Sequence, residues 1–100
     1  MLGLNMLRKL EDGILILCEG ELYTLALARA SLSAWLETNF TEIQAKQAAL
    51  RLSRLKLVKW HYYEKGKYKV SYRLKTGSCR VTLKATLKGE EYLSQARAAA

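Results

Sequence analysis

The 100-residue sequence contains no proline, only two cysteines and one histidine, and no long apolar run. Without a stretch of about 18 apolar residues, a membrane-spanning helix is not expected. Cys18 and Cys79 lie far apart, and with His61 they do not form the ligand spacing of a zinc site. We therefore predict no metal and two reduced, at least half-buried thiols. The N-terminus has no convincing secretory signal, so we expect a cytoplasmic protein.

Residue patterns typical of catalytic sites are equally sparse. His61 lies in an aromatic segment without a carboxylate placed to orient it, so packing explains it better than general-base chemistry. Glu90 and Glu91 begin a predicted helix, where acidic side chains favour the helix dipole. The sequence has neither a glycine-rich phosphate loop nor a Gly-x-Ser-x-Gly elbow. We predict that the protein is not an enzyme and needs no cofactor.

Basic residues are concentrated in the later part of the chain. Residues 1–40 carry three Lys/Arg against five Asp/Glu, whereas residues 41–100 carry fourteen against four, within an overall net charge of +8. Between residues 46 and 88 the single acidic residue is Glu64. Such an excess indicates a polyanionic partner. The basic residues alternate along predicted strands and do not line an amphipathic helix, which favours nucleic acid over an anionic membrane surface.

Two helices are predicted in the first 40 residues. Residues 4–18 place Leu and Ile at three- and four-residue steps, which is the period of an amphipathic helix. Residues 22–38 are rich in Ala and Leu and apolar around most of the circumference. Such a helix is central to a fold or contacts a partner chain. For Trp35 we favour a place in the core over a dimer contact.

A third helix is predicted over residues 41–56, where Thr41 and Gln44 form a capping box. One arc of this helix carries small apolar residues, which permit close packing on its neighbours. The arc beside it is polar and consists of Gln44, Gln47, Arg51 and Arg54, and Lys46 lies near a smaller apolar spot.

Alternation with a period of two predicts a basic β-ribbon next. Residues 67–75 and 79–85 form its two strands, and Thr76-Gly77-Ser78 is the expected hairpin tip because Gly tolerates positive φ. Residues 58–63 predict a further strand, followed by a turn over residues 64–67. The residues expected on the buried face of the longer strand are Tyr68, Val70, Tyr72 and Leu74. The other face of the sheet is expected to carry Lys67, Lys69, Arg73, Lys75, Arg80 and Lys84.

A last helix is expected over residues 87–98, with Thr86 as its N-cap. The sequence contains no internal repeat and no linker. Its length is typical of one hydrophobic core, so we predict a single domain over residues 1–100.

The order helix, helix, helix, β-ribbon, helix resembles a winged helix-turn-helix domain over residues 4–97. The segment AKQAALRLSRLKLVKW resembles the recognition helix and its exit, with apolar Ala45, Ala49 and Leu52 before a Leu-Val pair. The segment LKATLKGEEYL resembles the end of a wing that runs into Thr-x-x-Gly and an apolar helix. The chain is most similar to small regulators of the PadR and MarR kind. It departs from them in having Lys56 where Gly usually precedes the pair, a longer second helix and an additional strand.

The resemblance implies an α+β winged-helix fold and binding to duplex DNA, either sequence-specific or general, by a small transcriptional regulator. Helix 41–56 would enter the major groove, where Gln favours adenine and Arg favours guanine, and the wing would contact the DNA backbone. A homodimer is expected because such regulators usually bind two half-sites. The residues expected to contact DNA are Gln44, Lys46, Gln47, Arg51, Arg54, Lys65, Lys67, Lys69, Arg73, Lys75 and Arg80.

A winged-helix adapter that binds RNA or a protein partner is the alternative. Aromatic side chains can stack on unpaired bases. The alternation of the later tyrosines with Val70 and Leu74 favours core packing for most of them. The aromatic residues concerned are Trp60, Tyr62, Tyr63, Tyr68 and Tyr72.

Overall fold

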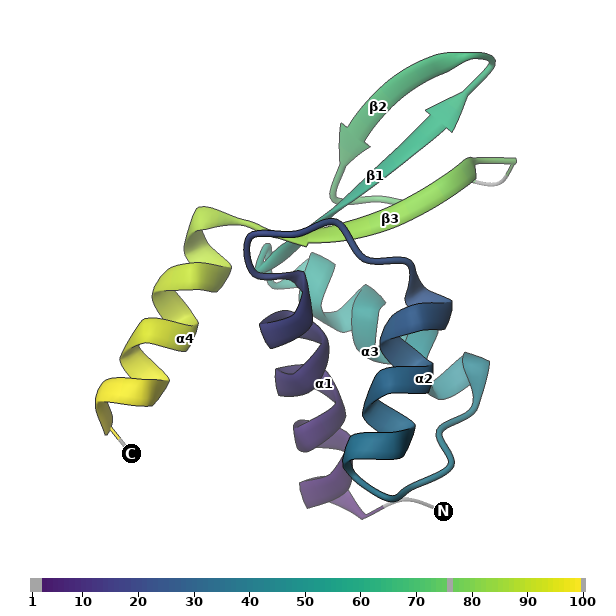
Figure 1. The fold of residues 1–100 in the computed structure, drawn as a ribbon. Coiled ribbons are helices and arrows are strands. Elements are labelled where there is room, and N and C mark those ends of the chain that lie inside the picture. Colours follow the sequence, from purple (N-terminus) through teal and green to yellow (C-terminus); the bar gives the residue numbers. More distant parts are fainter. Residues whose placement is uncertain (1–2, 76, 100) are drawn as a thin grey trace.

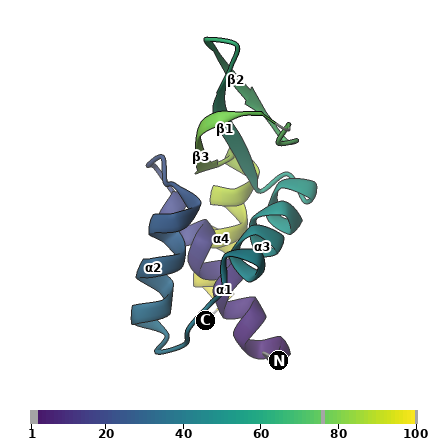
Figure 2. The ribbon, with the colours of Figure 1, turned by 90° about the vertical axis from the view of Figure 1, so that its right-hand side faces the viewer.

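The computed structural model describes residues 3–75 and 77–99 and has, over these residues, four helices and one three-stranded antiparallel sheet (Figure 1). This confirms the α+β class expected from the sequence. Three helices pack together at the base of the sheet, and its strands extend away from them (Figure 2). In chain order the elements are α1 (Leu4–Cys18), α2 (Leu25–Trp35), α3 (Glu42–Arg54), β1 (Val58–Glu64), β2 (Lys67–Ser71), β3 (Cys79–Ala85) and α4 (Leu87–Ala99).

The core lies where α1, α2 and α3 meet the base of the sheet. Trp60 and Tyr62 of β1 are its largest side chains, each 1% exposed. Ala45 and Ala49 of α3 are fully buried, and their small size lets α3 approach its neighbours closely. Burial of one large apolar side chain contributes about 1.5–3 kcal/mol, so this cluster is the main source of stability.

Helix α1 has the predicted bounds, but α2 is shorter than the predicted helix 22–38. It begins at Leu25, because the Thr24 side chain accepts a hydrogen bond from Leu27 N and caps the helix. Tyr23 does not belong to the helix, because its backbone forms an antiparallel bridge with Leu83 of β3. Trp35, the last residue of α2, is 66% exposed, so its expected place in the core is wrong.

The predicted capping box of α3 is confirmed. Gln44 N donates to Thr41 Oγ1 at 3.1 Å, and Thr41 N donates to Gln44 Oε1 at 2.9 Å. At the other end, Lys56 N donates to Ser53 O and Leu57 N donates to Leu52 O, each at 3.0 Å. This is a Schellman motif, which requires a left-handed residue after the helix.

Lys56 occupies that left-handed position, with φ 64°. It is the position at which winged-helix sequences usually have Gly. The departure noted in the sequence therefore leaves the geometry of the helix end intact, and a lysine adopts a conformation that favours glycine.

The strands are ordered β2-β1-β3, so the predicted hairpin between strands 67–75 and 79–85 is wrong. Strand β1 lies between them and forms its hairpin with β2 through Lys65 and Gly66, with φ 51° and 78°. Two positive φ values define a type I′ turn, whose twist suits adjacent strands. The segment expected as the hairpin tip connects β2 to β3, and its Thr76 lies outside the described residues.

Strand β2 ends at Ser71, earlier than predicted, and its register reverses the expected faces. Tyr62 pairs with Lys69 on the side facing the helices, and Tyr63 pairs with Tyr68 on the opposite side. Tyr68 and Val70 are therefore 52% and 44% exposed. Their predicted burial is wrong because they lie opposite the buried Tyr62, on the outward side of a hairpin that extends beyond the helices (Figure 1).

Helix α4 follows β3 directly, and Thr86 is its N-cap, as predicted. Gly89 N donates to Thr86 Oγ1 at 3.1 Å, while Thr86 N donates to Leu57 O at 2.9 Å. Gly89 and Leu93 are buried, and Arg97 nearer the end of α4 forms an ion pair with Glu19, which follows α1. Among the described residues, no helix combines the length and apolarity needed to cross a membrane.

Candidate nucleic-acid interface

Helix α3 presents a polar and basic side to solvent. Lys46, Gln47 and Arg54 are exposed, and Ile43 among them is 68% exposed. At 100° per residue, Ile43, Gln47 and Arg54 lie within one narrow arc opposite the buried Leu52. This side is free of the packing that holds the alanine side against the core.

Two further predicted contact residues of α3 have partners within the protein. The Gln44 side chain is part of the capping box, so a base contact would have to compete with the hydrogen bond that its Oε1 accepts from Thr41 N. Arg51 Nε donates to Glu11 Oε1 of α1 at 3.1 Å, in an ion pair whose arginine side chain is 66% exposed. Exposed ion pairs are worth at most about 1 kcal/mol, so Arg51 can exchange Glu11 for another anion.

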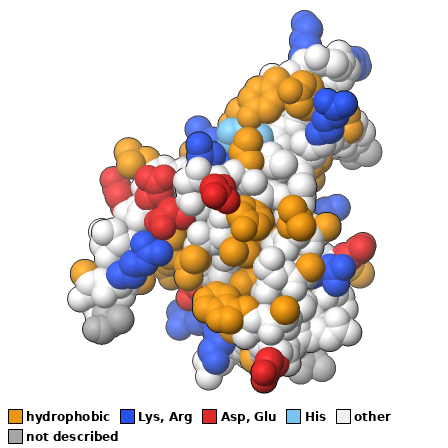
Figure 3. Space-filling model, in the orientation of Figure 1, with side chains coloured by type: hydrophobic (Ala, Val, Ile, Leu, Met, Phe, Trp, Pro, Cys, Tyr) orange, Lys and Arg blue, Asp and Glu red, His pale blue; other side chains and the backbone are white. Residues whose placement is uncertain are grey.

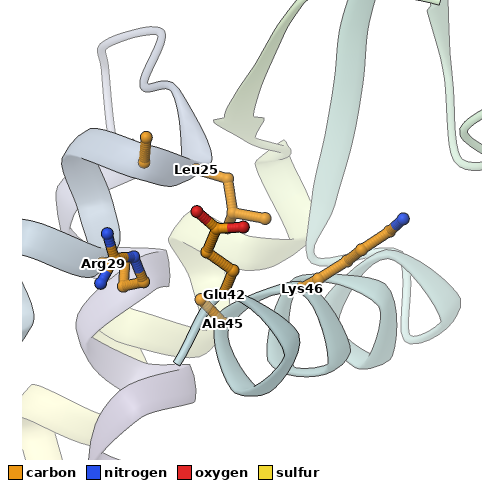
Figure 4. A pocket seen from close by; sticks show the side chains of 6 residues that line it. Leu25, Arg29, Glu42, Ala45 and Lys46 are labelled. Atoms are coloured by element: carbon orange, nitrogen blue, oxygen red, sulfur yellow. The ribbon is translucent and has the colours of Figure 1, made fainter. Parts of the chain in front are cut away.

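A shallow depression of about 320 Å³ lies between α2 and α3 (Figure 4). Arg29 lines it and donates from Nη1 to Phe40 O at 3.2 Å, which ties α2 to the connection before α3. Glu42 adds a carboxylate to the depression, and Lys46 points away from Arg29. A carboxylate at this place disfavours phosphate, so the depression adds nothing to an anion site.

The β1–β2 hairpin, which we call the wing, carries exposed cations at its tip. Lys65 and Lys67 are exposed on either side of Gly66. Lys69 instead donates from Nζ to Glu64 Oε1 at 2.9 Å. That hydrogen bond lowers the pKa of Glu64 and raises the pKa of Lys69, so both remain charged near neutral pH. Arg73 and Lys75 are exposed in the connection after β2.

The side of the sheet facing away from the helices, which we call the outer face, carries a group of aromatic rings. The ring centroids of Tyr63 and Tyr68 lie 5.3 Å apart in an edge contact, and those of His61 and Tyr68 lie 5.8 Å apart. His61 Nδ1 and the Tyr68 hydroxyl are hydrogen bonded. On the side of the molecule drawn in Figure 3, hydrophobic side chains cover much of the wing and basic side chains lie at its tip.

Cations surround these rings. The Arg80 guanidinium lies 5.7 Å from the Tyr63 ring centroid, and Lys59 Nζ lies 5.2 Å from that of Tyr72. Burial, followed by the charges of Lys84 and Lys59, lowers the pKa of His61 below its ordinary 6.5, so the ring is neutral at pH 7.

The basic residues of the sheet therefore do not share one face, although the sequence predicted that they would. In the pairing register, Lys67 and Lys69 lie on the side of Tyr62, whereas Lys84 pairs with Lys59 on the outer face. Arg80 lies beside an irregularity in the β1–β3 pairing and reaches Tyr63. The Lys65-Gly66 turn is the signal in the sequence that β1 pairs with β2. That pairing places the two groups of cations on opposite faces of the sheet.

Cys79 is exposed, against the expectation for both thiols, while Cys18 is buried as expected. Burial raises the pKa of the Cys18 thiol to about 12. Within residues 3–75 and 77–99, no three His, Cys, Asp or Glu side chains cluster closely enough to hold a metal ion.

Comparison with protein-family models, curated protein sequences and solved structures finds no match for this chain. The case for a function therefore comes from the shape and charge of the surfaces described above.

Proposed function

We propose that the protein is a winged-helix domain that binds duplex DNA, with α3 in the major groove and the wing on the DNA backbone. The observation that carries the proposal is the exposed arc of α3, where Gln47 and Arg54 lie opposite a fully packed alanine side. A helix of this kind fits the width of the major groove.

The order of the elements supports the same proposal. The pairing of Tyr23 with Leu83 places a short extended segment between α1 and α2 against β3. Together with β3 and β1, this extended segment forms the small sheet expected of a winged helix. Strand β2 is an additional strand at the free edge of that sheet. Helix α3 leads directly into this wing (Figure 2).

The side chains divide into two roles under this proposal. Gln47 contacts adenine, Arg54 contacts guanine or phosphate, and the exposed Ile43 suits the methyl group of thymine. Cations of the wing and its connection contact phosphates, which gives affinity without sequence choice. These cations are Lys65, Lys67, Arg73 and Lys75, all of which are exposed.

The experiment compares Gln47→Ala with Lys67→Ala on duplexes selected from a randomised library. Gln47→Ala should reduce the ratio of selected to unselected binding by about 5- to 100-fold, because one bidentate base contact is worth about 1–3 kcal/mol. Lys67→Ala should weaken both kinds of duplex alike. An unchanged ratio in Gln47→Ala would contradict base contact by α3.

A homodimer remains part of the proposal. Helix α2 presents an uncharged outer side on which Leu27 and Trp35 are 59% and 66% exposed. Leu87 of α4 is exposed as well. Sedimentation equilibrium at micromolar concentration measures the mass of the particle in solution. A monomer at the highest concentration would contradict the proposed homodimer.

A further inference from the structure

We propose that the outer face of the sheet is a second binding surface, which takes single-stranded nucleic acid by stacking unpaired bases on Tyr68 and its neighbours. The ligand class is an oligonucleotide with accessible base faces, of DNA or RNA. None of the α3 residues proposed to contact duplex DNA lies on this face, so the inference does not rest on the proposed function. The residues of the surface are Lys59, His61, Tyr63, Tyr68, Val70, Tyr72, Arg80 and Lys84.

The rings on this face are accessible in a way that core aromatics are not. Tyr68 is 52% exposed and Val70 beside it is 44% exposed, whereas Trp60 and Tyr62 on the opposite side of β1 are each 1% exposed. Every base has a flat π-face, so an exposed aromatic ring of fixed orientation binds bases with little sequence preference.

The ring of Tyr68 is held in place before any ligand arrives. His61 bonds its hydroxyl, and the Tyr63 ring contacts it at an interplanar angle of 62°. A side chain that is already ordered loses little rotamer freedom on binding, which favours affinity. Tyr68 therefore has the properties of a stacking platform, with an apolar extension provided by Val70.

The charge of the face complements a phosphate backbone. Lys59 and Lys84 are direct partners in the β1–β3 register, and two like charges opposite each other in a sheet destabilise it. A phosphate between them would remove that repulsion. In the described part of the chain, the strand residues that point to this side include no carboxylate, and Glu64 is occupied by Lys69 on the other side.

The same features argue for a single strand over a duplex. In a duplex the base faces are stacked on one another and closed to a tyrosine ring, and recognition proceeds through grooves and backbone. An aromatic surface flanked by cations is typical of proteins that bind unpaired strands. The cations that flank the rings here are Lys56, Lys59, Lys84 and Arg80.

The test measures binding of fluorescent twelve-residue oligothymidylate and oligouridylate by anisotropy, and comparison of the two distinguishes DNA from RNA. Tyr68→Ala should weaken binding by about 5- to 100-fold, the usual effect of losing one stacked base. Tyr68→Phe keeps the ring but loses the hydrogen bond to His61, so it should weaken binding much less than Tyr68→Ala. Tyr92→Ala, which removes an exposed tyrosine of α4, is the matched control and should have no effect.

A second measurement uses the unchanged protein and so does not depend on the folding of a variant. The chain has one histidine, so His61 gives a single pair of ring signals in a proton NMR spectrum. Oligothymidylate should shift these signals through the ring currents of nearby bases, and an abasic oligomer of equal charge should shift them much less.

Equal binding of the abasic and base-containing oligomers, or an unchanged affinity in Tyr68→Ala, would overturn the inference. Gln47→Ala separates the two proposals, because it should leave oligothymidylate binding unchanged. If duplex DNA does not bind but the single strand binds through Tyr68, only the proposed function fails.

Discussion

Tyr23 and Leu83 exchange both of their backbone hydrogen bonds, at 2.9 and 2.7 Å. This pairing fastens the connection between α1 and α2 to β3, so β3 has a partner on each side and β2 is left as the free edge of the sheet. The two surfaces proposed to bind nucleic acid lie on different parts of this arrangement. One is the outward arc of α3, and the other is the uncovered side of the strands that extend beyond the helices.

The left-handed conformation of Lys56 predicts a stabilising substitution. A non-glycine residue in this conformation costs about 1–2 kcal/mol, so Lys56→Gly should raise the free energy of unfolding by up to about 1 kcal/mol after the loss of side-chain contacts. Urea denaturation measures the change. Lys56→Ala is the control, since it removes the same contact with Tyr72 but keeps the conformational cost, and it should not stabilise the protein.

His61 predicts a pH dependence. Its pKa should lie below 6.5 when followed by NMR, because burial and the charges of Lys84 and Lys59 disfavour the imidazolium. The unfolded chain then binds more protons than the folded one, so stability should fall as the pH is lowered from 6.5 through the folded pKa.

Lys84→Gln should raise the pKa of His61 but leave it below 6.5, since burial is the larger cause. Lys88→Gln makes the same charge change on α4 and should have little effect. A pKa at or above 6.5 in the unchanged protein would contradict the arrangement of the outer face.

The ion pair between Arg51 and Glu11 predicts a gain in duplex affinity. Glu11→Gln removes a negative charge beside α3 and releases Arg51, so duplex DNA should bind about two- to fivefold more tightly at low salt. Glu19→Gln is the matched control, because Glu19 forms a similar ion pair with Arg97 of α4. Equal gains in both variants would show that only net charge matters, which would contradict a specific place for α3 in the complex.

Local signals in the sequence predicted local structure well. The capping residues Thr41 and Gln44 marked the start of α3, and the spacing of Leu and Ile gave the bounds of α1. The start of α2 was missed because the backbone of Tyr23 pairs with Leu83, 60 positions away in the chain, and no local pattern reveals such a partner.

The candidate site was harder to predict for the same reason. Tyr68 and Lys69 alternate in the sequence in the same way whichever strand lies beside them, so alternation does not say which one faces the helices. Gln44 was assigned both to a helix cap and to a base contact, and the structure shows the cap, which engages its side-chain oxygen. The rings of the outer face were attributed to the core because the extension of the wing beyond the helices is a property of the whole fold.

The most direct test of the central claim is the salt dependence of duplex DNA binding by the unchanged protein. Besides the ion-paired Arg51, six cations are exposed on α3, the wing and the connection after it: Lys46, Arg54, Lys65, Lys67, Arg73 and Lys75. If these cations make about six phosphate contacts, a plot of the logarithm of the association constant against the logarithm of salt concentration should have a slope of about −5. A flat dependence, or no binding at low salt, would contradict the proposal that this protein binds duplex DNA.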